Sequence, residues 1–291
     1  MQEIRNSSIT VFGCFTERNV SAHFMNTGKL VRLNRLFSHP SGRLCSVAVD
    51  HFVGYSFATL PDGLRNIKPT LEQIVAGKPD AVTMQKGLAS SAWQPYAGRI
   101  PMIMQTSGIT VDDVSTEQIG TPEDAVRLGA DAVAVAAFVR GDTQGYHLGT
   151  IAEVVRQAAV WDIPVICHIY PRVFDPEPAI SFEPEDIAWA VRCAFECGAD
   201  VVKVPFCHDV EAYRQIVDDC PVPVVAAGGP KTSTMLEALQ SLANVVASGA
   251  RGATIGRNVW GNETITKNVL AVKAVIHDGM SAESAMRHAG L

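Results

Sequence analysis

The sequence predicts an α/β protein, a (β/α)8 TIM barrel with an N-terminal extension. Short runs of apolar and β-branched residues alternate with longer helical patterns along the chain, and this alternation is typical of parallel βαβ units. There are eight such runs, each apolar throughout, as expected of strands that helices bury on both faces. The 291 residues suit a single barrel. We therefore expect an extension over residues 1–43 and one catalytic barrel domain over residues 44–291.

The expected strands cover residues 45–50, 80–84, 100–105, 131–138, 163–169, 200–204, 222–227 and 252–256. Three of the intervening helices have recognisable starts. Residues 121–124 (Thr-Pro-Glu-Asp) offer an N-cap, a first-turn proline and acidic side chains, and residues 183–186 do the same. Thr232-Ser233 opens a helix that we expect to reach about residue 246.

A doubly wound sheet is the structural alternative. That fold would call for a Gly-x-Gly-x-x-Gly turn after the first strand. Residues 49–54 read Val-Asp-His-Phe-Val-Gly instead, so the barrel is favoured.

Two segments lie outside the repeating pattern. The N-terminal extension is basic, and such an extension on an acidic body is more often a cap on the barrel bottom or a subunit contact than a nucleic-acid arm. Its basic residues are Arg5, Arg18, Lys29, Arg32, Arg35 and Arg43. Residues 171–184 contain four prolines and predict a long loop after the fifth strand, which would overhang the barrel mouth as a lid.

Composition narrows the class of protein. The chain is 47% hydrophobic and 19% charged, with a net charge of −6, which indicates a folded globule and argues against a nucleic-acid partner. Its seven cysteines are odd in number, and several lie in apolar runs, as in reduced cytoplasmic proteins. The first ten residues are polar and predict no signal peptide. No apolar run approaches the roughly 18 residues of a membrane span.

Residues able to do chemistry follow the expected strands where each strand ends. They are Asp50 and His51, His168 and Tyr170, Lys203, Gly228 and Gly229, and Gly256 and Arg257. Active sites of these barrels lie at the carboxyl ends of the strands. We therefore expect an amine, a carboxylate, a phenol and a cation to face one cavity.

Lys203 indicates the reaction. It stands in an otherwise apolar strand, and an ammonium is costly to bury unless it is paired or neutralised. A desolvated lysine is also the nucleophile that forms Schiff bases with carbonyl compounds. Tyr170 could then move a proton, and Asp50 could bind hydroxyl groups or assist loss of water.

The last two strands predict a phosphate site. Barrel enzymes often bind phosphate in the loops after strands seven and eight, through glycine N–H groups. Gly228-Gly229 and Gly256-Arg257 fall at those places, and Lys231 and Arg257 would add positive charge. The chain has no Gly-x-x-x-x-Gly-Lys-[Ser/Thr] motif, so nucleotide hydrolysis is not indicated.

Other interpretations stay open at this point. Lys203 could be a structural lysine that extends from a strand end, and the Gly228-Gly229 pair an ordinary tight turn. His51 and His168 could be packing or pocket residues, or ligands of a divalent-metal aldolase. Such an enzyme needs more ligands than the sequence offers, and neighbours such as Cys207-His208-Asp209 rarely converge on one ion. We therefore expect no metal and no cofactor.

The order of motifs resembles the archaeal-type class I fructose-bisphosphate aldolase family, which includes an autoinducer-2 phosphate thiolase and an aminodeoxyheptulosonate synthase. The motifs are residues 32–37 (Arg-Leu-Asn-Arg-Leu-Phe), 47–51 (Val-Ala-Val-Asp-His), 170–172 (Tyr-Pro-Arg), Val202-Lys203, 228–231 (Gly-Gly-Pro-Lys) and 256–258 (Gly-Arg-Asn). The resemblance spans about residues 28–277, nearly the whole chain.

The resemblance implies a role for each matching residue. Lys203 would be the Schiff-base lysine, Tyr170 the proton donor and acceptor, and Asp50 the acid of the first strand. Gly229, Lys231, Gly256 and Arg257 would bind phosphate. By analogy with related members, it also implies a homo-oligomer, built as a ring of subunits.

The chain departs from the family pattern near the sugar end of the pocket. The polar stretch that usually follows the lysine is replaced by Val204-Pro205-Phe206-Cys207-His208, His168 stands where the aldolase branch often has tryptophan, and Phe52 replaces a glycine. We therefore predict a class I aldolase for a phosphorylated ketose without fixing the sugar. The alternatives are acyl or ketol transfer by the same lysine, as in a thiolase or transaldolase, and a barrel that binds a sugar phosphate without catalysis.

Overall fold

The computed structural model describes residues 26–54, 62–109, 116–175 and 177–291. Arg5, Arg18 and Cys14 of the basic extension lie outside these residues. None of the helices in the described ranges is long and apolar enough to span a membrane.

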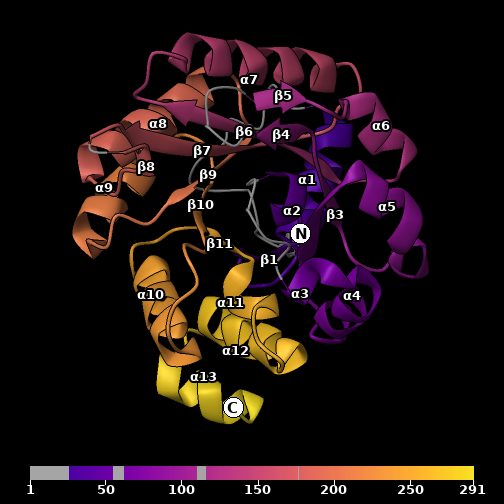
Figure 1. Ribbon diagram of the computed structural model, residues 1–291, viewed down its shortest axis with the longest axis vertical. Helices are drawn as coiled ribbons and strands as arrows, with labels where there is room; N and C mark the ends of the chain where they lie inside the picture. The colour runs from indigo at the N-terminus through magenta and orange to yellow at the C-terminus, as the bar shows by residue number, and fades with distance from the viewer. Residues whose placement is uncertain (1–25, 55–61, 110–115, 176) are drawn as a thin grey trace, which may run out of the picture.

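Eight parallel strands of the described chain close into a barrel (Figure 1). They are β1 (Leu44–Ala48), β2 (Ala81–Gln85), β3 (Met102–Gln105), β6 (Ala132–Val139), β7 (Val165–Val173), β9 (Val201–Pro205), β10 (Val224–Ala227) and β11 (Gly252–Ile255). Strand β6 pairs with both β3 and β7, which closes the ring. Each expected strand coincides with one of these eight, and the predicted TIM barrel is confirmed.

Helices surround the strands (Figure 1). They are α1 (Thr27–Leu36), α2 (His51–Gly54), α3 (Asp62–Arg65), α4 (Ile67–Ala76), α5 (Lys86–Ala92), α6 (Pro122–Arg127), α7 (Gln144–Ala159), α8 (Pro184–Glu196), α9 (Val210–Asp219), α10 (Met235–Ala247), α11 (Arg257–Trp260), α12 (Ile265–Asp278) and α13 (Ala282–Ala289), with a 3-10 turn at Gln94–Tyr96. Short strands β4 (Ser107–Ile109) and β5 (Thr116–Gln118) form a separate antiparallel pair.

The interior of the barrel is apolar at the bottom. Side chains that alternate along each strand point inward, and those nearest the strand starts form one buried cluster. Its barrel members are Leu44, Ala81, Ile103, Ala132, Ala134, Ile166, Val201 and Val225. The layer seals the barrel below the mouth, so a ligand can enter only from the carboxyl ends of the strands.

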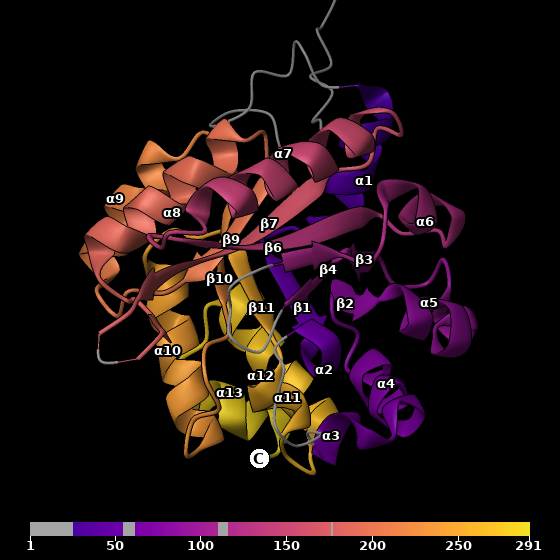
Figure 2. The ribbon, with the colours of Figure 1, turned by 45° about the horizontal axis from the view of Figure 1, so that its top comes forward.

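Helix α1 covers this bottom layer. Leu33, Leu36 and Phe37 are buried and belong to the same cluster as the strand residues. Lys29 pairs with Asp200 at 3.0 Å and Arg35 with Asp131 at 3.1 Å. The basic residues in this part of the extension thus fasten a cap to the barrel. Figure 2 shows α1 and α11 on opposite sides of the molecule.

The predicted helix starts are confirmed at α6 and α8 and corrected at α10. Thr121 and Asp124 form a capping box at α6, and α8 begins at Pro184. Helix α10 is capped by Thr234, not by Thr232-Ser233. The reason is that the Thr232 N–H and hydroxyl both bind the Asn258 side chain, which keeps Thr232 in the preceding loop.

The long loop expected over residues 171–184 is partly a hairpin. Strand β7 continues to Val173, and β8 (Ala179–Ile180) returns antiparallel to it, with Arg172 opposite Ile180. Ile180 and Phe182 line the cavity at the barrel mouth. The segment therefore overhangs the mouth as predicted, but two strands hold it there.

Candidate active site

A cavity at the barrel mouth gathers most of the residues singled out by the sequence. Its walls come from the ends of β7, β9, β10 and β11 and from the segment after β1. The lining residues are His51, Tyr170, Ile180, Phe182, Lys203, Pro205, Ala227, Gly228, Gly229, Pro230, Thr254, Gly256 and Arg257. Asp50 and His168 are buried next to these residues, whereas Lys231 is exposed and lies outside the lining.

Lys203 is the third residue of β9, and only 3% of it is exposed. Its register neighbours are His168 on β7 and Val225 on β10. Val201, two residues earlier, belongs to the apolar bottom layer. The amine therefore enters the cavity from the barrel floor, where little water reaches it.

Asp50 is buried close to this lysine. Its Oδ2 accepts a hydrogen bond of 3.1 Å from Gln105 Nε2, and its Oδ1 lies 3.4 Å from His51 Nδ1. Burial alone would raise the pKa of the Asp50 carboxyl, but the adjacent His51 ring and the Lys203 ammonium together lower it well below its usual value. Asp50 is thus an anion buried beside Lys203.

The two histidines of the mouth are neutral groups. Burial lowers the pKa of His51, although Asp50 acts in the opposite direction. Burial and then the Lys203 charge lower the pKa of His168 well below its usual value. Gly256 makes room for the His51 ring, because a Cβ there would lie 2.3 Å from His51 Cε1. Within the described ranges no three His, Cys, Asp or Glu side chains form a metal site.

Tyr170 forms the wall of the cavity on β7. It is 5% exposed, and its ring packs against Phe138 with 6.1 Å between centroids. The Arg172 guanidinium covers the same Phe138 ring at 4.2 Å. Tyr170 thus packs against a covered aromatic ring and lines the same cavity as Lys203.

His147 of α7 is fully buried behind this wall. Its ring meets the edge of Phe138 at 5.3 Å, and neither ring nitrogen has a hydrogen-bond partner among the described residues. Burial, followed by the Arg172 charge, lowers the pKa of His147 from 6.5 to about 4. The ring is therefore neutral in the folded protein at neutral pH.

Because His147 is buried as a neutral ring, we expect the free energy of unfolding to fall in mild acid. The unfolded chain binds a proton at His147 near pH 6.5 and the folded chain only near pH 4. The unfolded state thus binds more protons as the pH falls, and the free energy of unfolding decreases. Between pH 7 and pH 5 the decrease from this group is about 2 kcal/mol. Denaturant unfolding of His147→Leu at both pH values should show a smaller decrease by that amount.

The control for this experiment is His288→Gln, since His288 is exposed on α13. It should keep the pH dependence of the natural protein. An equal decrease in His147→Leu and the natural protein would contradict the assignment.

The loops after β10 (Gly228-Gly229) and β11 (Gly256-Arg257), called here the two glycine loops, form another part of the cavity wall. Gly229 adopts a left-handed backbone, with φ of 68°, that suits glycine. Arg257 Nη2 donates a 2.9 Å hydrogen bond to the Gly229 carbonyl, which joins the loops after β10 and β11. The Gly228 N–H donates to the Thr254 carbonyl at 2.9 Å. Gly228 thus supports the loop through the backbone, and its N–H is engaged within the protein.

Lys231 is placed differently from the other predicted phosphate residues. Its ammonium donates a 2.6 Å hydrogen bond to the carbonyl of Gly261, away from the cavity lining. The structure therefore brings Arg257 to the mouth and does not bring Lys231 there.

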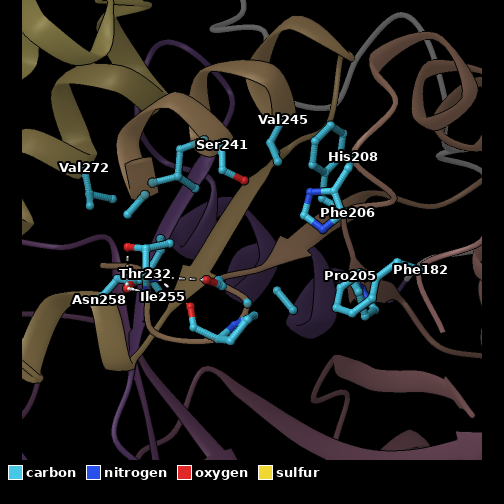
Figure 3. Close-up of a pocket in the computed structure, with 16 residues that line it drawn as sticks. Phe182, Pro205, Phe206, His208, Thr232, Ser241, Val245, Ile255, Asn258 and Val272 are labelled. Carbon is cyan, nitrogen blue, oxygen red and sulfur yellow. Dashed lines mark hydrogen bonds between the residues drawn. The ribbon is translucent and has the colours of Figure 1, made fainter. Parts of the chain in front are cut away.

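Asn258 organises this region, and the sequence assigned it no role. Its Nδ2 donates to the Gly228 and Pro230 carbonyls at 3.2 and 3.1 Å, and its Oδ1 accepts the Thr232 N–H at 2.9 Å (Figure 3). One side chain thus satisfies three backbone groups of the loop after β10. In the sequence Asn258 appeared only as the last residue of the 256–258 motif, which by itself did not indicate that its side chain holds the neighbouring loop.

A second, mostly apolar cavity lies behind the same loop, between the strands and α10 (Figure 3). Phe182, Pro205 and residues 227–230 line both cavities. Phe182 also contacts the His208 ring at 5.2 Å, which links the segment after β8 to the segment after β9. The wall between the cavities is therefore the expected phosphate loop itself.

A barrel that presents a buried lysine, an anionic carboxylate, a phenol and paired glycine loops at one mouth defines an aldolase of the (β/α)8 class. The profile of the DeoC/LacD family of aldolases matches residues 44–262. The chain belongs to this family, and the predicted family resemblance and aldolase class are confirmed.

Relatives and solved structures agree with this assignment. The 2-amino-3,7-dideoxy-D-threo-hept-6-ulosonate synthase of Halobacterium salinarum is 33% identical over 91% of this chain and 98% of its own. The class 1 fructose-bisphosphate aldolase of Thermoproteus tenax is 29% identical over 84% of this chain and 93% of its own. A solved archaeal fructose-1,6-bisphosphate aldolase, with its catalytic lysine bound to a carbinolamine intermediate, is 26% identical, covers 86% of this chain and 99% of its own, and has a TM-score of 0.74.

Proposed function

We propose that this class I aldolase cleaves or forms a phosphorylated ketose through an imine on Lys203. One observation carries the proposal: Lys203, Tyr170, the two glycine loops and Arg257 line a single cavity. The amine and the phenol lie on the β7 and β9 side, and the phosphate loops follow β10 and β11. A ketone with a phosphate at one end fits between them.

The reaction follows from these positions. The Lys203 amine adds to the ketone carbon, and loss of water gives an iminium ion. The carbon–carbon bond breaks as the neighbouring hydroxyl loses its proton, and the electron pair passes to the iminium to form an enamine. The aldehyde leaves, a proton returns to the enamine carbon, and water releases the lysine.

Tyr170 and Asp50 divide the proton transfers. Tyr170 lines the same cavity as Lys203, and its phenol serves as proton donor and acceptor for the hydroxyl and the enamine carbon. Asp50 is held as an anion beside Lys203. It assists loss of water from the carbinolamine and accepts hydrogen bonds from substrate hydroxyls, and the neutral His51 and His168 complete the pocket.

Treatment of the protein with dihydroxyacetone phosphate and sodium borohydride tests the proposal. The intact mass should rise by one reduced three-carbon phosphate, and the protein should also cleave a phosphorylated ketose. Dihydroxyacetone without phosphate, at the same concentration, should label far less because the two glycine loops have nothing to bind. Binding without any adduct would favour a non-catalytic sugar-phosphate barrel. An adduct with transfer to a thiol or sugar acceptor, but without cleavage, would favour the thiolase or transaldolase alternative.

Arg257→Ala should weaken the binding of phosphorylated substrates and leave the binding of dephosphorylated ones nearly unchanged. A hydrogen bond to a charged group contributes about 1.5–3 kcal/mol, so KM for a phosphorylated substrate should rise roughly 10- to 100-fold. KM for the dephosphorylated analogue should change little. Arg192→Ala is the matched control, because Arg192 is exposed on α8 and pairs with Glu196 there. Equal effects on both substrates would exclude Arg257 as a phosphate ligand, and Lys231→Ala examines the remaining predicted cation in the same assay.

We also propose that the protein is a cytoplasmic homo-oligomer. The six cysteines within the described ranges are all unpaired, which suits a reducing compartment. The oligomer rests on the analogy with related aldolases. Sedimentation velocity of the full chain decides it, and a single species of monomer mass would refute it.

A further inference from the structure

The Gln105 side chain lies between the carboxylate and the histidine of the site. Gln105 is the last residue of β3 and is 2% exposed. Its Nε2 lies 3.1 Å from Asp50 Oδ2 and 3.3 Å from His168 Nδ1. No sequence motif drew attention to it, and the reaction described above does not use it.

The orientation of the Gln105 amide is fixed by the backbone. Its Oε1 accepts the N–H of Ser107 at 3.1 Å, and a backbone N–H can only donate. Ser107 is itself held, because its carbonyl accepts from Gln85 Nε2 at 3.0 Å and its hydroxyl accepts the Ala136 N–H at 3.0 Å. The amide NH2 group must therefore face Asp50 and His168.

This orientation determines the tautomer of His168. The amide NH2 has two hydrogens, one for Asp50 Oδ2 and one for His168 Nδ1. Nδ1 then accepts, so the hydrogen of the neutral ring sits on Nε2. Burial and the Lys203 charge lower the pKa of His168, and the ring does not take up a second proton near neutral pH.

We propose that Gln105 is a positioning residue that fixes His168 as a neutral Nε2–H donor beside Lys203 and holds Asp50 as an acceptor. His168 and Lys203 are register neighbours on adjacent strands. A neutral ring adds no positive charge next to the amine, which must be unprotonated to attack a carbonyl. The Nε2–H, on the ring side opposite Gln105, is left to donate to a substrate hydroxyl. This catalytic consequence rests on the proposed function, whereas the tautomer itself does not.

Neither leucine nor glutamate, the side chains of similar size, can donate hydrogen bonds to both Asp50 Oδ2 and His168 Nδ1. Leucine would leave Asp50 Oδ2 and His168 Nδ1 buried without their donor. Glutamate would place a second carboxylate against Asp50 and offer His168 an acceptor, which favours the opposite tautomer or a charged ring. Gln105→Leu and Gln105→Glu therefore make a pair of variants with different expected outcomes.

Long-range proton–nitrogen NMR of the free protein tests the tautomer directly. The His168 signals, assigned by loss in His168→Gln, should show an unprotonated Nδ1 and a protonated Nε2 from pH 6 to pH 8. Gln105→Leu should give mixed tautomers, and Gln105→Glu should protonate Nδ1. Signals of the exposed His288 should not move in either variant. A protonated Nδ1 in the natural protein, or His168 signals unaffected by both variants, would overturn the proposal.

Kinetics separate positioning from a merely structural role. Gln105→Leu should lower kcat about 10- to 100-fold and leave KM for the phosphorylated substrate nearly unchanged, because the glycine loops are untouched. Gln215→Leu, on the exposed face of α9, is the control for loss of a glutamine. If the NMR outcome holds and no imine forms with any ketone, the proposed function fails and the tautomer assignment stands. An unchanged kcat in Gln105→Leu would overturn the positioning role.

Discussion

Replacement of Lys203 by methionine should abolish both covalent trapping and turnover. Methionine fills the same space but carries no amine, so no imine can form. Loss of a group that bonds covalently to substrate lowers turnover on the order of 10⁴-fold or more. Steady-state kinetics and intact mass after borohydride treatment give the two readouts.

Two controls make the Lys203 result specific. Lys86→Met removes an exposed lysine that pairs with Asp124 at the surface, and it should trap normally. A thermal melt of Lys203→Met must show a folded protein, because the variant leaves the buried Asp50 without its neighbouring charge. Undiminished trapping in folded Lys203→Met would move the imine to another lysine.

Tyr170→Phe should separate imine formation from the later proton transfers. Phenylalanine keeps the ring that packs against Phe138, so the cavity retains its shape. Removal of a general acid–base group typically costs about 10²- to 10⁴-fold in rate. Turnover should fall by that factor while borohydride still traps the adduct on the lysine.

Tyr146→Phe, at an exposed position on α7, controls for loss of a phenol. It should leave turnover unchanged. Normal turnover in Tyr170→Phe would exclude a proton shuttle at this residue, and loss of trapping would place Tyr170 in the formation of the imine instead.

The fold was predictable because burial on both sides leaves a strong trace in the sequence. Eight short apolar runs between helical segments correspond to the eight barrel strands. The convergence of strand ends followed from the fold, and it brought Tyr170, Lys203, Gly229 and Arg257 to one cavity.

The interior above the bottom layer was harder to predict. The strands were expected to be apolar throughout, but several carry buried polar residues that face the barrel axis. These include Ser46, Thr83, Gln105, His168 and Thr254. A single polar residue in a run of five does not disturb the apolar pattern, so Gln105 gave no signal. Its importance depends on partners 55 and 63 residues away.

The directions of the Lys231 and Arg257 side chains could not be predicted from the sequence either. Lys231 and Arg257 are both cations just after a glycine motif, and spacing alone treats them alike. In the structure Arg257 binds the Gly229 carbonyl, and Lys231 turns to the Gly261 carbonyl. The difference depends on tertiary contacts between the loops after β10 and β11, to which the Asn258 side chain contributes four hydrogen bonds.

The most direct test of the account locates the borohydride-stabilised adduct of dihydroxyacetone phosphate by peptide mass spectrometry. We expect the added mass on the peptide that contains Lys203, with fragment ions that place it on the Lys203 amine. An adduct on any other lysine, or cleavage of a phosphorylated ketose with no adduct at saturating substrate, would contradict it.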